Sequence, residues 1–177
     1  MNHQELAKLS RDPSRRAEFI EAVPYMKWYE GIDFRKNPEL YQIGKGEQGV
    51  LMAEPYKGEI VPHWKFKTPE IALKSSQIIE KMFHDYMNAG DFVGADMARK
   101  YLMMGWTRAR RYANHPSGRK YKPGTREVLP QAEDHATSDK AVSAQIFKEA
   151  YDRARVNKTY LAMKEEHKRL LKRTANK

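Results

Sequence analysis

Residues 99–126 combine charged and aromatic side chains in the pattern with the clearest chemical meaning in this chain. The segment contains no Asp or Glu. Its nine basic residues are Arg99, Lys100, Arg108, Arg110, Arg111, Arg119, Lys120, Lys122 and Arg126, and between them lie Tyr101, Trp106, Tyr112 and Tyr121. Guanidinium groups bind phosphates through paired hydrogen bonds, and aromatic rings stack on unpaired bases. The segment therefore predicts contact with a nucleic acid.

Ten residues of this segment are candidate nucleic-acid ligands. They are Arg99, Lys100, Arg108, Arg110, Arg111, Tyr112, Arg119, Lys120, Tyr121 and Lys122. A structural interpretation competes with this one, because a charged helix face is often only solvated. Tyr101 and Trp106 also recur at helical spacing, which is typical of core residues.

A glycine-rich sequence at residues 43–50, IGKGEQGV, has the G-x-G-x-x-G form of a nucleotide-binding loop. A β-prone run follows Gly49, where a dinucleotide-binding fold requires a helix. No kinase catalytic loop and no Asp-Phe-Gly sequence occurs downstream. We interpret the motif as a turn between strands, in which glycine supplies positive φ. An anion held by its backbone amides is the alternative.

Metal-binding and catalytic residue types show no recognisable spacing. The histidines are His3, His63, His84, His115, His135 and His167, and no two of them have the spacing of metal ligands on a helix. We therefore expect no metal and no cofactor, and the catalytic residues are unknown. A metal-dependent nuclease would need converging carboxylates and a lysine. Those types are present as Asp33, Glu47, Glu54, Lys57, Glu59 and Lys65, without a known pattern.

Charge is segregated along the 177 residues, whose net charge is +10. Residues 1–96 carry 13 basic and 15 acidic side chains, whereas residues 97–126 carry nine basic and none acidic. Residues 147–177 carry ten basic and four acidic side chains. Solubility alone favours an even mixture of signs. Segregation favours a polyanionic partner, which is either nucleic acid of unknown type or an acidic protein surface.

Composition places the chain in a reducing compartment and away from membranes. It contains no cysteine, which excludes disulfides and cysteine-based metal sites. The first sixteen residues, MNHQELAKLSRDPSRR, contain no apolar run, so we expect no signal peptide. The longest uncharged apolar stretch is far shorter than the roughly 20 residues of a membrane helix. The C-terminal LAMKEEHKRLLKRTANK is basic but lacks an aromatic anchor. We predict a cytoplasmic protein with no membrane partner.

Helices are the elements that would position the basic segment. Thr68-Pro69-Glu70 is typical of a helix start, and Asn88-Ala89-Gly90 of a helix end. Asp91 can cap a second helix that runs to about residue 113. The short connection predicts an antiparallel helical hairpin over 69–113. A short helical segment ending at Pro24 is also expected.

Residues 40–66 differ in composition from the predicted helices. They contain short β-prone runs at 40–43, 49–53, 59–61 and 64–66, which are separated by glycines and prolines. The predicted fold class is α+β, mostly α, with a helical hairpin, a C-terminal helix and a small β-hairpin or irregular sheet. We expect a single globular domain over 1–137, with a basic loop at 114–137. A C-terminal basic helical region follows over 138–177, capped by Ser138.

Two stretches, residues 32–72 and 90–121, resemble a known family. They read IDFRKNPELYQIGKGEQGVLMAEPYKGEIVPHWKFKTPEIA and GDFVGADMARKYLMMGWTRARRYANHPSGRKY, about half of the chain. The family comprises proteins of bacteria and tailed phages and carries only a domain-of-unknown-function label. The resemblance implies a cytoplasmic protein and transfers no catalytic residue. It does not extend to residues 1–31 and 122–177, so the C-terminal helix would be particular to this member.

The sequence thus predicts a basic, non-enzymatic protein that binds DNA or RNA through phosphate contacts. The alternative is a protein–protein interaction module, such as a phage-type effector that binds an acidic host protein. A further alternative is a nuclease or nucleotide-processing enzyme.

Overall fold

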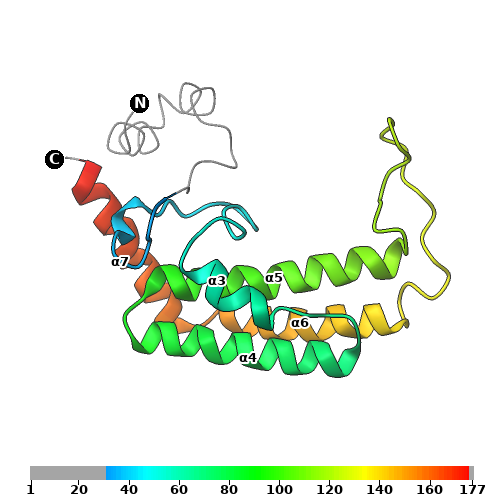
Figure 1. The fold of residues 1–177 in the computed structure, drawn as a ribbon, viewed down its shortest axis with the longest axis horizontal. Coiled ribbons are helices and arrows are strands. Elements are labelled where there is room, and N and C mark those ends of the chain that lie inside the picture. The colour runs from blue at the N-terminus through cyan, green and yellow to red at the C-terminus, as the bar shows by residue number, and fades with distance from the viewer. Residues whose placement is uncertain (1–30, 176–177) are drawn as a thin grey trace.

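The computed structural model describes residues 31–175, and long helices make up most of this part of the chain. They are α4 (Pro69–Asn88), α5 (Phe92–Asn114), α6 (Asp139–Arg155) and α7 (Lys158–Ala175). The first three lie side by side, and α7 extends from the end of α6 away from these three helices (Figure 1). Three short elements precede them: η3 (Pro38–Leu40), α3 (Tyr56–Ile60) and η4 (Val61–His63).

The predicted helical hairpin is formed by α4 and α5, whose start signals act as the sequence indicated. The Thr68 hydroxyl accepts a hydrogen bond from the amide of Ile71 at 3.3 Å, and Pro69 occupies the first helical turn. Asp91 accepts from the amide of Gly94 at 2.9 Å and so begins α5. Ser138 begins α6 in the same way.

The core lies where α4, α5 and α6 meet. Phe83, Leu102 and Phe147 come from these three helices and are fully buried. Gly105 allows α5 to approach α6 closely, because a Cβ atom there would lie 2.3 Å from Cδ1 of Phe147. Tyr160 of α7 also belongs to this core. The helices after residue 137 therefore share one core with α4 and α5.

The predicted β-hairpin or irregular sheet at residues 40–66 is wrong. Among the described residues no sheet is formed, and the chain shows only two isolated bridges, Asp33 with Glu54 and Tyr121 with Val128. Residues 40–66 instead form turns and the short helices α3 and η4. Apolar side chains of the runs that suggested strands are instead buried in the helical core: Tyr41, Val50, Ala53 and Ile60.

The glycine-rich motif within this segment is a turn, although not one between strands. Gly46 and Gly49 have φ values of +55° and +85°. L-residues with a side chain rarely adopt this conformation, so glycine is needed at both positions.

Residues 115–138 leave the end of α5, project from the bundle and return to the start of α6 (Figure 1). We call this segment the arm. Its two limbs are joined by backbone hydrogen bonds from Lys122 to Glu127 and from Leu129 to Lys120, at 3.0 and 2.8 Å. At its base the amide of Ala132 donates to the carbonyl of Asn114 at 2.9 Å.

The helix predicted before Pro24 lies outside residues 31–175. Within that range, no helix has the length and apolar character that crossing a membrane requires.

Candidate nucleic-acid interface

The last turns of α5 expose two of the predicted arginines. Arg108 and Arg111 are three residues apart and so lie on neighbouring positions of one helix surface. Both are exposed, whereas Ala109 and Ala113 face the protein interior. Neither guanidinium has a hydrogen bond or ion pair to any described residue.

The arm, which follows α5 directly in the chain, carries further exposed cations. Arg119, Lys120 and Arg126 are exposed, and none of them pairs with a described carboxylate. The ammonium of Lys120 lies 5.4 Å from the ring centre of Tyr121. Lys122 differs, because its ammonium is 2.7 Å from the carboxylate of Glu127. We call Arg108, Arg111, Arg119, Lys120 and Arg126 the basic surface.

Arg110 has a structural role instead. Its guanidinium donates to the carbonyl of His135 at 2.8 Å and to the carbonyl of Ala141 at 3.4 Å. His135 is in the arm and Ala141 is in α6, so this side chain ties the base of the arm to the bundle. The prediction that Arg110 is a phosphate ligand is therefore not favoured by its geometry.

Arg99 and Lys100 are also unsuited to phosphate binding, since both are buried in the core. They surround Asp96, which is fully buried one turn earlier on α5. The guanidinium of Arg99 is 2.7 Å from the Asp96 carboxylate, and the ammonium of Lys100 is 3.8 Å from it. Lys100 also donates to the carbonyl of Gln48 at 2.8 Å.

Two tyrosine hydroxyls complete this buried cluster. Tyr41 and Tyr160 each donate to Asp96, from the 31–54 segment and from α7 respectively. Burial alone would raise the pKa of Asp96, but Arg99, Lys100 and these hydroxyls hold that pKa below its usual value. Burial lowers the pKa of Lys100 to about 8, against the opposing attraction of Asp96. The cluster thus joins α5, α7 and the segment around Tyr41 at the Asp96 carboxylate.

The sequence interpretation missed a neighbour of the basic surface, the segment between η4 and α4. The Phe66 ring lies 6.5 Å from that of Tyr112, between centres. The ammonium of Lys140 on α6 donates to the carbonyls of Phe66 and Lys67, at 3.3 and 3.0 Å. Exposed Lys65 and Lys67 therefore lie at the same end of the bundle as Tyr112. No local signal in the sequence could indicate this tertiary contact.

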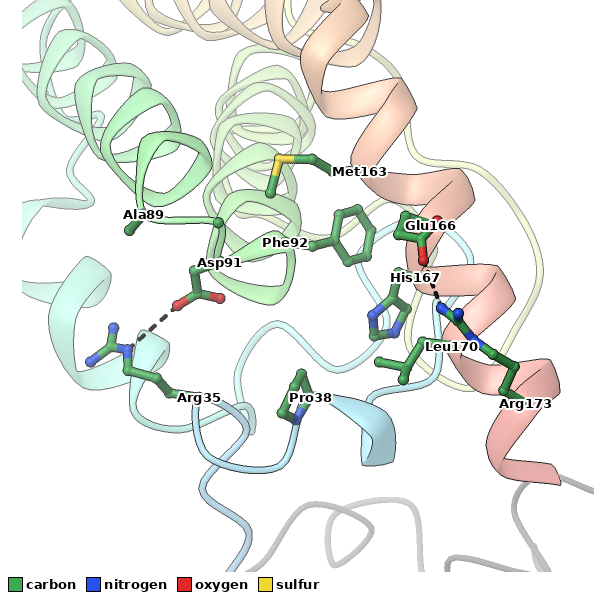
Figure 2. A pocket seen from close by; sticks show the side chains of 11 residues that line it. Arg35, Pro38, Ala89, Asp91, Phe92, Met163, Glu166, His167, Leu170 and Arg173 are labelled. Carbon is green, nitrogen blue, oxygen red and sulfur yellow. Dashed lines mark hydrogen bonds and ion pairs between the residues drawn. The ribbon is translucent and has the colours of Figure 1, made fainter. Parts of the chain in front are cut away.

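A pocket of about 540 Å³ lies near the opposite end, between the α4–α5 turn, the segment around Pro38 and α7 (Figure 2). Phe92, Met163 and Leu170 form its apolar part. Its two arginines are already paired: Arg35 with Glu59 at 2.8 Å, and Arg173 with Glu166 at 2.6 Å. Among residues 31–175, no cluster of three or more potential ligands is arranged to hold a metal ion.

The eleven described arginines thus divide into three groups. Those bonded to a carboxylate are Arg35, Arg99, Arg153, Arg155, Arg169 and Arg173. Arg110 is bonded to carbonyls. Those with neither partner among the described residues are Arg108, Arg111, Arg119 and Arg126, and all four lie in the last turns of α5 or in the arm.

Comparison with known proteins identifies one family. Its model, described as a domain of unknown function (DUF4385), matches residues 24–170. The resemblance seen in the sequence is confirmed, and it extends through most of α7, which is therefore not particular to this member. No curated protein and no solved structure matches the chain.

Proposed function

The chain belongs to this family of unknown function, and we propose that it binds nucleic acid by holding phosphate groups on the basic surface. The observation that supports the proposal is the division of the arginines. Six arginines elsewhere in the described structure are neutralised by carboxylates, whereas the four at this end are exposed and have no such partner.

Unpaired arginines are well suited to phosphate. The guanidinium is planar, always charged and less strongly hydrated than an ammonium, and it matches two phosphate oxygens at once. A surface that needed charge only for solubility would not require arginine in particular, nor its concentration at one end. Phosphate contacts carry little sequence information, so we expect binding with little dependence on base sequence.

The proposed contact region is narrower than the segment seen in the sequence. It excludes Arg99 and Lys100, which are buried, and Arg110, which anchors the arm. Acidic residues limit it on the returning limb of the arm, where Glu133 and Asp134 are exposed. The end of α5, the outgoing limb and the tip of the arm with Arg126 are therefore the surface that a polyanion would meet.

A gel-shift panel tests the proposal directly. The wild-type protein is mixed with single- and double-stranded DNA and RNA at two salt concentrations. We expect binding at low salt that weakens at high salt, because bound phosphates release counterions. Replacing Arg108 and Arg111 by Ala should weaken affinity for every bound nucleic acid by roughly 5- to 30-fold. Absence of any shift at low salt would refute the proposal.

The same panel separates the alternatives. An interaction module for an acidic protein would show low affinity for all nucleic acids at both salt concentrations. A nuclease would shorten a labelled substrate when a divalent metal ion is added. As for location, the absence of cysteine favours a reducing compartment, and we propose the cytoplasm.

A further inference from the structure

A row of aromatic rings runs from the core to the basic surface. Fully buried Tyr101 contacts Trp64 at 5.8 Å between ring centres, Trp64 contacts Phe66 at 5.1 Å, and Phe66 contacts Tyr112 at 6.5 Å. The indole of Trp64 donates to the carbonyl of Tyr101 at 3.1 Å, which fixes its orientation. The row ends in Tyr112, which is 41% exposed.

The position of the Tyr112 ring is fixed from two sides. Phe66 lies behind it, and Phe66 is in turn held by Lys140, whose ammonium is 5.6 Å from the phenyl centre. On another side the backbone at Gly118 lies against Tyr112, because a Cβ atom there would be 2.8 Å from Cε1 of the ring. Gly118 also has a φ of +74°, so this approach suits glycine. Tyr112 is thus exposed yet held in place.

A second exposed ring lies in the arm. Tyr121 is 45% exposed and pairs across the arm with Val128. The ammonium of Lys120 lies 5.4 Å from the centre of the ring. Tyr121 therefore lies beside a cation of the basic surface, Lys120. Tyr112 follows Arg111 in the last turns of α5.

A single exposed tyrosine needs no explanation. Two exposed rings in the same part of the chain as the cations of the basic surface resemble the arrangement by which proteins bind single strands. There the cations follow the phosphates and the aromatic faces stack on successive bases. In a duplex the base faces are already stacked on one another, so exposed tyrosines gain little from it.

Given the proposed function, on which this step depends, we propose that the preferred ligand is single-stranded nucleic acid and that Tyr112 and Tyr121 stack on its bases. Stacking requires only a π-face, so every base is accepted. Lys65 and Lys67, which flank Phe66, would extend the path of the backbone past Tyr112.

Fluorescence anisotropy with a labelled 20-nucleotide DNA strand and with its duplex tests this inference. The variants are Tyr112→Leu and Tyr121→Leu, with Tyr112→Phe and Tyr121→Phe as matched controls that keep the ring. We expect each Leu variant to lower single-strand affinity by roughly 5- to 100-fold, while duplex affinity changes less than about two-fold. Each Phe variant should bind as the wild type does.

The outcomes separate this inference from the proposed function. Leu variants that retain single-strand affinity, or that lose single-strand and duplex affinity equally, would refute the stacking inference. The proposed function would still stand if Arg108→Ala with Arg111→Ala weakened both ligands. Tyr121→Leu keeps the test valid if Tyr112→Leu perturbs folding, because Tyr121 lies in the arm and outside the core.

Discussion

Tertiary contacts determine whether a basic side chain of this protein is buried in an ion pair or exposed to solvent. Arg99 and Arg108 occupy the same helix, but Arg99 is buried against Asp96, whereas Arg108 is exposed and has no ion-pair partner among the described residues. The sequence identified both as cations. It could not show that Tyr41 and Tyr160 converge on Asp96, because these residues are far apart along the chain.

Removing the central carboxylate should be the most damaging change in the buried cluster. Asp96→Asn leaves the buried Arg99 and Lys100 cations without their counterion, and we expect it to lower the free energy of unfolding by about 3–5 kcal/mol. Lys100→Met replaces a buried cation by an apolar chain of similar length and leaves Asp96 paired with Arg99. Because it also leaves the Gln48 carbonyl without its donor, we expect a loss of about 1–3 kcal/mol, smaller than that of Asp96→Asn. Urea denaturation of both variants measures these effects, and equal losses of stability would contradict this account.

The cluster also predicts a pH dependence. The pKa of Lys100 is lowered from 10.5 to about 8 in the folded protein, so between these values the unfolded chain holds a proton that the folded protein has released. On account of this group, stability should rise with pH through that window and be lowest below pH 8. The difference in unfolding free energy between wild type and Lys100→Met isolates it, because other titrating groups cancel. A difference that is constant from pH 7 to 10 would contradict the assignment.

Among the elements, helix ends were more predictable from sequence than the segment between them. Thr68, Asp91 and Ser138 act as caps where the sequence placed them. Residues 40–66 were wrongly assigned to strands because their apolar side chains pack against helices and not in a sheet. A short apolar run does not reveal whether it packs in a sheet or against a helix.

The close contact between α5 and α6 should tolerate no added side chain. A Cβ at Gly105 would lie 2.3 Å from the ring of Phe147, which is fully buried. We expect Gly105→Ala to destabilise the protein by about 1–3 kcal/mol through overpacking, despite the better helix propensity of Ala. Thermal unfolding measures the change. A variant more stable than wild type would contradict the observed packing.

The arm should depend on Arg110 for its attachment. Arg110→Ala removes the hydrogen bonds to the carbonyls of His135 and Ala141, at a cost of about 1–3 kcal/mol for the groups left behind. We expect trypsin to cut within residues 119–126 several-fold faster in this variant. Arg108→Ala is the matched control, because that side chain makes no such bonds. Equal cleavage rates in the two variants would show that Arg110 does not anchor the arm.

At the scale of the whole molecule, the two ends of the bundle differ in how their charges are used. The basic surface lies at one end of α5, and α7 lies toward the other (Figure 1). The 23 residues of α5 span about 35 Å at the helical rise. Three cations on α7 are paired within the helix: Lys168 with Glu165, and Arg169 and Arg173 with Glu166. Carboxylates within α7 thus offset part of its positive charge.

The salt dependence of binding tests the central claim most directly. The slope of log K against log salt concentration is measured for wild type, for Arg108→Ala with Arg111→Ala, and for Arg169→Ala with Arg173→Ala. The two double variants remove the same charge from opposite ends of the molecule. If the basic surface holds phosphates, the first should reduce the slope by about two, one for each arginine that no longer binds a phosphate, and the second should leave it nearly unchanged. Equal reductions would mean that net charge, and not this surface, drives binding.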